Sequence, residues 1–203
     1  MTVESTSGTG SFDLRERKRT RTRLMIQTEA LRLFEEKGYA QTTVDEIADR
    51  AAISPRTFFR YFPTKEDIAL YDALDPVLLG AFRAQPANLS PIQALRGAMW
   101  QVFADLPQAE LAMQQERDAL IRSVPELRAR MLDEFAKSLE LFAEIVAERV
   151  GRRPDDPAVR ALAGAVIGVG ISAWYTAGHH ASPKDYLAVM DAGLAQLEAG
   201  LPL

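Results

Sequence analysis

The chain has 203 residues and a formal net charge of −4, a length that fits one large domain or two modest ones. It contains no cysteine, which excludes disulfide bonds, zinc sites built on cysteine and cysteine nucleophiles. Residues 1–70 carry 12 basic and 11 acidic side chains and the remainder carries 12 and 17, so the acidic total does not exclude a nucleic-acid partner, which needs only one basic face.

Residues 1–14 are rich in Ser, Thr and Gly, a composition that predicts a disordered tail. They contain no apolar signal core, so we expect a cytoplasmic protein. Residues 15–23 then hold six Lys or Arg side chains against one Glu. This run is either a solvated charge cluster or an arm that binds DNA phosphates. Its position directly before a helix favours the arm, with Arg19 and Arg21 as phosphate contacts.

The first predicted helix follows the basic run. Ile26, Ala30, Leu33 and Phe34 are spaced as one apolar stripe of an amphipathic helix. Gly38 comes after this stripe and suits the left-handed position just past a helix end. The pattern predicts an amphipathic helix that ends before Gly38.

Two short helices are predicted within residues 43–62. Thr43 and Glu46 have the spacing of a capping box, which begins the first of them. Ser54 and Pro55 begin the second, because serine caps free N–H groups and proline is tolerated at the first helical position. The few residues between them allow only a tight corner. This pattern is typical of a helix-turn-helix, which places its second helix in the DNA major groove.

The second of these helices divides into two faces. Phe58 and Phe62 are four residues apart and are expected to pack inward. The residues left on the outer face are Arg56, Thr57, Phe59, Arg60 and Tyr61. Arginine reads guanine with two hydrogen bonds, threonine touches base edges, and a tyrosine hydroxyl reaches phosphate. The alternative is that Phe59 and Tyr61 only support a small three-helix core.

Residues 20–68 resemble the N-terminal domain of the TetR family of transcriptional repressors. The matching residues are Ala30, Phe34, Gly38, Tyr39, Thr42, Thr43, Ile47, Ala48, Ser54, Thr57, Phe59, Tyr61, Phe62 and Lys65. The resemblance implies a homodimer with a small DNA-binding head, residues 15–63, and a larger helical body, residues 64–203, that binds an effector and dimerises.

The resemblance also implies roles for single residues of the head. Thr57, Phe59 and Arg60 would face bases, and Arg56 on the same outer face joins them as a predicted base contact. The implied phosphate contacts are Thr42, Thr43, Tyr61 and Lys65. Family members often have Tyr and His at the positions of Phe59 and Arg60, so the operator sequence stays open.

The body is predicted to be entirely helical. Breaks at proline and glycine delimit helices near residues 65–84, 91–105, 108–122, 125–150, 157–178 and 184–199. No segment alternates as a strand or carries a hairpin turn. The sequence therefore predicts an all-α fold with a three-helix head and a larger helical body.

Residues 70–145 are rich in methionine and aromatic side chains. Most of these belong to an ordinary core, but such residues also line adaptable pockets. The predicted pocket residues are Met99, Trp100, Phe103, Met113, Arg117, Phe135, Leu139 and Phe142. Nearby arginines, Arg122 among them, either hold ligand phosphates or form ion pairs along their helices. The body resembles TetR-like regulators, including mycofactocin-system regulators, whose effectors are acyl-CoA-like, so we expect a small apolar effector of that kind.

Residues 161–177 form an uncharged run. A membrane span needs about twenty strongly apolar residues, and this run is largely Ala and Gly, so we expect a buried helix and no membrane partner. Its small residues permit close approach of a second helix. Together with the last predicted helix it would form a four-helix interface between two subunits. The predicted interface residues are Gly164, Gly168, Ile171, Tyr186, Met190 and Leu194.

The competing functional class is an enzyme, and the sequence gives little support for it. The only two histidines, His179 and His180, are adjacent and would point apart on a helix. No nucleophile elbow, P-loop or dinucleotide motif is present. We therefore expect no catalytic residues, no metal and no cofactor. The predicted function is a homodimeric repressor that leaves a palindromic operator when a small apolar effector binds; the alternative is a helical protein-interaction adaptor without a small-molecule effector.

Overall fold

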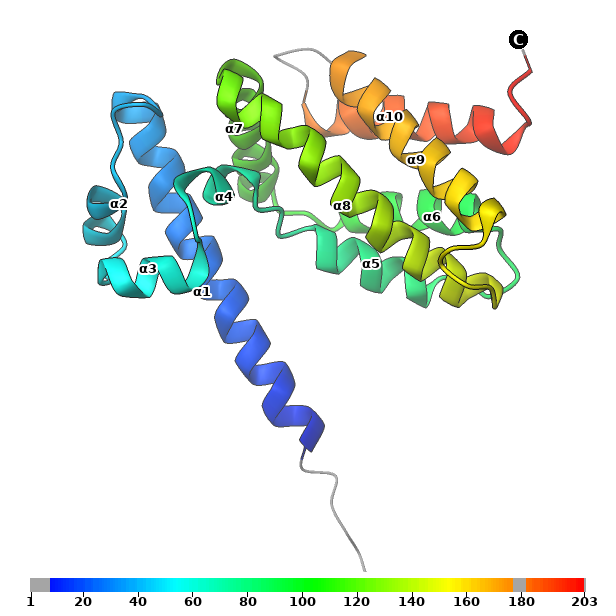
Figure 1. Ribbon diagram of the computed structural model, residues 1–203, viewed down its shortest axis with the longest axis horizontal. Helices are drawn as coiled ribbons and strands as arrows, with labels where there is room; N and C mark the ends of the chain where they lie inside the picture. The colour runs from blue at the N-terminus through cyan, green and yellow to red at the C-terminus, as the bar shows by residue number, and fades with distance from the viewer. Residues whose placement is uncertain (1–7, 177–181, 203) are drawn as a thin grey trace, which may run out of the picture. The chain divides into compact units, whose positions relative to one another are not determined.

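The computed structural model describes residues 8–176 and 182–202, with side chains from residue 18 onward. Within these ranges the chain is all-α, as predicted, and contains no strand (Figure 1). The helices are α1 (Gly8–Lys37), α2 (Val44–Arg50), α3 (Pro55–Tyr61), α4 (Lys65–Leu70), α5 (Asp75–Ala84), α6 (Pro91–Ala104), α7 (Gln108–Ser123), α8 (Pro125–Val150), α9 (Pro157–Thr176) and α10 (Pro183–Glu198).

The chain divides into two compact units, Met1–Ala73 and Leu74–Leu203. The division lies after Ala73, whereas the sequence predicts a boundary after residue 63. The difference arises because α4 packs against α1 and so belongs with the first unit. The helix predicted over 65–84 is accordingly two helices.

The break between α4 and α5 has a local cause and a tertiary one. Pro76 has no N–H to donate and its ring clashes with the preceding turn, so a continuous helix cannot pass through it. The buried Gln27 side chain of α1 donates from Nε2 to the carbonyl oxygens of Ile68 and Tyr71, both at 2.8 Å. These bonds satisfy two carbonyl groups at the end of α4.

The first unit is built as its sequence pattern predicts. Ile26, Ala30, Leu33 and Phe34 of α1 are all buried. Gly38 ends α1 with a positive φ of +87°, and the carbonyl of Phe34 accepts its N–H. Because this backbone conformation is costly for other residues, a glycine here marks the end of the helix.

α1 begins inside the segment for which composition predicts disorder. The structure has helix over residues 8–14, and residues 1–7 lie outside the described part of the chain. Extending an existing helix adds one hydrogen bond for each residue ordered, which is easier than starting a new one. The long amphipathic part of α1 therefore accounts for helix in a Ser/Gly-rich segment.

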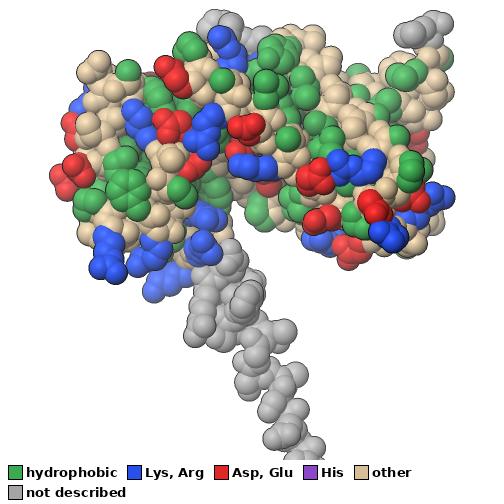
Figure 2. All heavy atoms as spheres, viewed as in Figure 1, with side chains coloured by type: hydrophobic (Ala, Val, Ile, Leu, Met, Phe, Trp, Pro, Cys, Tyr) green, Lys and Arg blue, Asp and Glu red, His purple; other side chains and the backbone are tan. Residues whose placement is uncertain are grey.

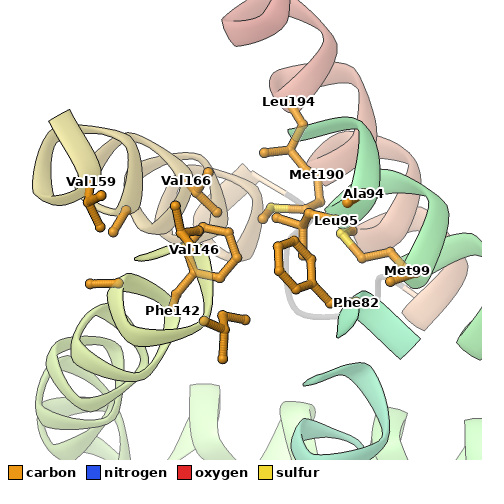
Figure 3. Close-up of a cluster of buried hydrophobic side chains, with 14 of the residues drawn as sticks. Phe82, Ala94, Leu95, Met99, Phe142, Val146, Val159, Val166, Met190 and Leu194 are labelled. Carbon is orange, nitrogen blue, oxygen red and sulfur yellow. The ribbon is translucent and has the colours of Figure 1, made fainter. Parts of the chain in front are cut away.

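The second unit is organised around one apolar core. α8 packs against α9, α9 against α10, and α5 against α6. Phe82 of α5 and Phe142 of α8 meet at a ring separation of 5.8 Å, and Val166 and Met190 lie beside them (Figure 3). Five of the predicted body helices, from residue 91 onward, are observed with nearly the predicted bounds.

α9 is the one helix of the described residues that is long and apolar enough to cross a membrane by length and composition alone. The core helix of a water-soluble protein passes the same test. In this structure α9 places Val159, Ala163, Val166 and Trp174 in the interior of the unit. One side of α9 is therefore buried in the single chain, where 33% of its most apolar stretch is buried, whereas the sequence predicts a buried helix.

Candidate nucleic-acid interface and effector-binding unit

The recognition face is the name we give to Arg56, Thr57, Phe59 and Arg60 of α3. α3 begins at Ser54, whose Oγ accepts the N–H of Thr57 at 3.1 Å and lies 2.9 Å from the Thr57 hydroxyl. The opposite side of the helix is anchored by the fully buried Phe58. The helix is therefore held from behind, and its recognition face is directed outward.

The exposures on this face agree with a role in binding. Arg56, Phe59 and Arg60 are exposed and Thr57 is half-buried. Phe59 is 52% exposed, although the edge of its ring contacts Phe58 at a centroid distance of 5.4 Å. The structure therefore places Phe59 on the surface and not in the three-helix core. An exposed aromatic ring beside two arginines is available to a base or a sugar.

α1 contributes to the same surface. A hydrogen bond with Thr22 of α1 lowers the pKa of Tyr61, and a hydrogen bond with Arg60 and the charges of Arg60 and Lys18 lower it further. The Arg60 guanidinium lies 5.3 Å from the centre of the Tyr61 ring. Figure 2 shows Lys and Arg side chains gathered along this edge of the first unit. A concentrated positive surface of this kind attracts a phosphate backbone.

The other predicted phosphate contacts of the head fall into two groups. Arg19, Arg21 and Thr43 are exposed. Thr42 is only 2% exposed, and its hydroxyl donates to the carbonyl of Gly38 at 2.9 Å. The structure therefore places the Thr42 side chain inside the unit, away from the solvent-facing role that the resemblance implies.

Lys65 is also held by partners within the unit. Its ammonium donates to the carbonyls of Tyr39 at 2.8 Å and Thr42 at 3.1 Å, and lies 4.2 Å from the centre of the Tyr39 ring. These contacts tie the start of α4 to the turn after α1. In this structure Lys65 positions the turn, and at least two of its N–H groups are already used.

An ion pair and a capping box join α1 to α2. The Thr43 hydroxyl caps the backbone N–H of Glu46, and the Glu46 carboxylate accepts the Thr43 N–H in return. The ammonium of Lys37, at the end of α1, is hydrogen-bonded to the same carboxylate. The bond to Lys37, followed by those to Thr43, lowers the pKa of Glu46 from 4.5 to about 2.

The predicted pocket residues are not all brought together. Met99 and Phe142 are buried in the core, and Phe103 and Leu139 pack against it. Trp100 is 49% exposed and hydrogen-bonds Asp191. The remaining three residues lie on other stretches of α7 and α8: Met113, Arg117 and Phe135.

Buried polar side chains lie on α7, and the sequence already names two of them, Arg117 and Arg122, as candidate effector contacts. In the described part of the second unit, every buried polar or charged side chain belongs to this helix: Gln114, Arg117 and Arg122. The Arg122 guanidinium lies 4.4 Å from the centre of the Trp174 ring of α9 and donates to the Trp174 carbonyl. Burial lowers the pKa of Arg122. The sequence names Arg122 as one of several arginines, but no pattern singles out its partner Trp174.

Two protein-family models match the chain. The model of bacterial regulatory proteins of the TetR family matches residues 26–71, which include α2, α3 and α4. The model of the MftR C-terminal domain, from the same group of regulators, matches residues 89–202. The chain belongs to the TetR family of bacterial transcriptional regulators. Its first unit is the DNA-binding helix-turn-helix of that family.

Named relatives of this TetR-family regulator are transcriptional regulators too. The chain is 38% identical over 150 residues to TcmR of Streptomyces glaucescens, a match that covers 70% of this chain and 66% of TcmR. It is 31% identical over 160 residues to the Mycobacterium tuberculosis protein named as the mycofactocin biosynthesis regulator MftR, covering 78% of this chain and 80% of that protein.

Solved structures of TetR-family proteins share the fold. Thermus thermophilus FadR, a TetR-family repressor solved in complex with lauroyl-CoA, matches with a TM-score of 0.58 at 24% identity, over 89% of this chain and 95% of that one. SmeT in complex with triclosan matches with a TM-score of 0.51 at 18% identity, over 86% and 90% of the two chains. At these identities the likeness concerns the fold.

The predicted dimer contacts of this TetR-family regulator differ in exposure. Met190 and Leu194 of α10 are buried in the core of their own chain, so their side chains already have partners. Gly168 of α9 is exposed, and a Cβ added there or at Gly164 would meet no atom within 4 Å. The other two predicted contacts, Ile171 and Tyr186, are half-buried. The exposed residues of these helices include several small ones, Ala161, Gly168 and Ser172 of α9 and Ala188 and Ala192 of α10, beside larger ones such as Tyr175, Lys184 and Gln196.

The structure describes only some of the residues that bear on the predicted absence of metal and catalytic sites. His179 and His180 lie outside the described residues. Among the residues that are described, no group of three or more potential ligands gathers to hold a metal ion.

Proposed function

We propose that this TetR-family regulator is a homodimeric repressor that occupies a palindromic operator and is released by a small apolar effector, an acyl-CoA-like molecule. The observation that carries the DNA-binding part is the exposed recognition face of α3, set on a family-matched helix-turn-helix and bordered by basic side chains. Arginine and threonine side chains on such a helix read base edges in the major groove.

Within this proposal the residues of the head divide into base and phosphate contacts. The base contacts are the four residues of the recognition face. The proposed phosphate contacts are Arg19, Arg21, Thr43 and Tyr61, which retain exposure. Thr42 and Lys65 hold the turn that positions α2 and α4. The contacts to phosphate fix the position of the head, and the contacts to bases provide specificity.

We further propose that the two chains meet through α9 and α10. The outward side of these helices carries alanine, glycine and serine, which allow two helix pairs to approach closely. A two-fold dimer presents two recognition helices to half-sites about one helical turn apart. The two-fold symmetry of the dimer therefore matches the two-fold symmetry of a palindromic operator.

The effector part is supported by the family to which the second unit belongs. This unit matches the MftR C-terminal domain, and the similarly folded FadR was solved with lauroyl-CoA bound. An effector releases the repressor only if it binds the non-DNA-bound arrangement of the dimer more tightly than the bound one. The ligand must therefore change the spacing of the heads, which is the property that an operator reads.

Two further properties follow from family membership. We propose that the protein is cytoplasmic, because a transcriptional regulator acts where the chromosome is. We propose no catalytic activity, since regulation by DNA binding and ligand binding accounts for both units. The alternative function, a helical adaptor without an effector, predicts a chain that binds another protein and ignores small molecules.

The test is fluorescence anisotropy of the purified full chain on a labelled duplex taken from upstream of its own gene, with and without lauroyl-CoA. We expect saturable binding that is stronger than binding to a random duplex, falls with salt, and weakens when lauroyl-CoA is added. Binding that ignores lauroyl-CoA would retain the repressor and reject the acyl-CoA class. No preference for the upstream duplex or for any selected duplex would reject the repressor and favour the adaptor.

A further inference from the structure

The interior of the second unit contains a buried guanidinium, Arg122, that no carboxylate of the described residues pairs with. Arg122 is 7% exposed and Arg117 is 8% exposed. Arg117 is paired with Asp118 of the same helix, whose carboxylate lies 3.4 Å from its guanidinium, and the charge of Asp118 offsets part of the effect that burial has on the pKa of Arg122. Among the described residues, no carboxylate lies within ion-pair distance of Arg122, which has only the Trp174 carbonyl and the Trp174 ring as direct partners.

Stability does not explain why α7 carries Arg122 at a buried position. Desolvating a guanidinium is costly unless an anion pairs with it. Replacing buried ions by apolar side chains of similar volume commonly leaves stability unchanged or raises it. A carbonyl oxygen and an aromatic face stabilise a cation only in part. The buried Arg122 guanidinium is therefore suited to pair with an anion that none of the described residues supplies.

The surroundings of Arg122 suit a ligand that is apolar beyond its charged group. The guanidinium stacks on the Trp174 ring, and Phe135 of α8 contacts the same ring at a centroid distance of 6.3 Å. Tyr175, next to Trp174, is 61% exposed, so this aromatic cluster reaches the surface of the unit. A planar guanidinium pairs with carboxylate or phosphate oxygens through two parallel hydrogen bonds, which a neutral ligand cannot match.

We propose that Arg122, stacked on Trp174, binds an anionic oxygen group, carboxylate or phosphate, of the apolar effector. This inference rests on the proposed function, because it assigns the charged end of that effector. It predicts that an apolar chain ending in an anion binds, and that the same chain ending in a hydroxyl binds much more weakly. Carboxylate and phosphate are distinguished by comparing dodecanoate with lauroyl-CoA.

The experiment is calorimetric titration of the full-length chain with dodecanoate, lauroyl-CoA and dodecanol, each below its aggregation threshold. We expect at least one anionic probe to bind with at least tenfold higher affinity than dodecanol. Arg122→Gln should weaken that probe about tenfold to a hundredfold, the range for a lost hydrogen bond to a charged group, and should leave dodecanol within about twofold. Arg83→Gln removes an exposed cation of α5 that is paired with Glu148, and it is the matched control. It should change neither the affinity for the anionic probe nor the affinity for dodecanol.

The place where the anionic probe binds is tested separately by the fluorescence of Trp174. The chain has two tryptophans, so Trp100→Phe leaves Trp174 as the only one. In this background the anionic probe should change Trp174 emission along the same binding curve as the calorimetry. If Arg122→Gln does not fold, as judged by circular dichroism, Arg122→Lys keeps the charge, removes the planar fork, and should still reduce the preference for the anion.

Three results would overturn the inference: no saturable binding of either anionic probe, equal weakening of dodecanol by Arg122→Gln, or unchanged affinity for the anion in a folded variant. Binding of the same samples to the upstream duplex is measured in parallel. A chain that prefers that duplex but fails these titrations loses only the anion site. A chain that passes them without any DNA preference retains the anion site and loses the proposed repressor.

Discussion

Arg60 is the residue of the recognition face whose role is easiest to separate from folding. It is exposed, and its guanidinium contacts the partly exposed Tyr61, so truncation removes nothing from the core. If Arg60 reads a base, Arg60→Ala should cost about 1–3 kcal/mol on the specific operator and relax the preference at one position. The measurement is competitive anisotropy against a set of operators that vary one base pair at a time.

Arg83→Ala is the control for Arg60, since it removes an exposed arginine from α5 in the second unit. It should alter neither the affinity nor the base preference. An equal loss for Arg60→Ala on random and specific duplexes would contradict base reading and would move Arg60 to the phosphate contacts.

Glu46 gives the head a measurable dependence on pH. Its pKa is lowered from 4.5 to about 2, chiefly by the hydrogen bond from Lys37. The folded state therefore binds this proton less readily than the unfolded state, and the carboxylate stabilises the fold most fully above pH 4.5. That contribution is lost as pH falls through about 2. Glu46→Gln should thus lower the thermal midpoint at neutral pH, and its difference from the parent chain should shrink between pH 4.5 and 2.

The check is thermal unfolding by circular dichroism across that pH range. Glu35→Gln removes an exposed carboxylate of α1 and serves as the matched control, with a small difference expected throughout. A constant difference between Glu46→Gln and the parent chain at every pH would contradict the assigned ion pair.

At the scale of residues, the sequence predicts what depends on neighbours in the chain. The spacing of Thr43 and Glu46 predicts the capping box, and the spacing of Phe58 and Phe62 predicts the inward side of α3; the structure has both. The internal roles of Thr42 and Lys65 depend on carbonyls of the turn between α1 and α2. The Trp174 partner of Arg122 is 52 positions away, and no local pattern reveals such a pair.

The end of α4 shows how one helix determines the limits of another. The amide of Gln27 satisfies two carbonyls where α4 stops, and its side chain is 2% exposed. Gln27→Leu keeps a similar volume but leaves both carbonyls without this donor. We expect a loss of about 1–3 kcal/mol for such unsatisfied buried groups, measured by urea denaturation of the full chain.

Gln41→Leu provides the comparison, because Gln41 is an exposed residue of the turn between α1 and α2. It should change the free energy of unfolding by about 0.5 kcal/mol or less. If Gln27→Leu were equally mild, water or another donor would be satisfying the end of α4, and Gln27 would not set its length.

At the scale of elements, prolines make most helix starts predictable. α6, α8, α9 and α10 each begin at a proline, where the missing N–H has no helical partner in any case. Gly151, with a φ of +65°, marks the end of α8 in the same local way. The 65–84 segment is different, because its apolar pattern continues across a break that Pro76 and the distant Gln27 side chain create together.

For the whole molecule, the sequence predicts which helices form the proposed subunit interface but not which of their sides are exposed. Met190 and Leu194 belong to the apolar stripe of α10. Both side chains are buried in the core of their own chain, so they do not lie on its surface. Gly193 shows how closely α9 and α10 already pack, since a Cβ there would lie 2.6 Å from Cγ1 of Val169. The opposite side of α9 and α10 is exposed in the single chain, and its alanine and glycine residues carry little hydrophobic signal.

A substitution at Gly168 tests the assembly of two chains independently of the folding of one chain. A Cβ at this position meets nothing within 4 Å in a single chain, and replacing a helical glycine raises helix propensity by up to about 1 kcal/mol. Gly168→Leu should therefore fold at least as stably as the parent chain. If α9 forms the interface, the leucine prevents the close approach of the second subunit. Sedimentation velocity should then show a shift from dimer to monomer, and the affinity for a palindromic operator should fall to that of one head.

Gly80 of α5 provides the matched control for this variant. It is exposed and helical, and a Cβ there also meets nothing within 4 Å, so Gly80→Leu introduces the same side chain away from α9. It should sediment as the parent dimer and keep the operator affinity. A dimeric Gly168→Leu would place the subunit contact elsewhere on the second unit. A monomeric parent chain that still binds the palindrome tightly would mean that two heads meet only on DNA.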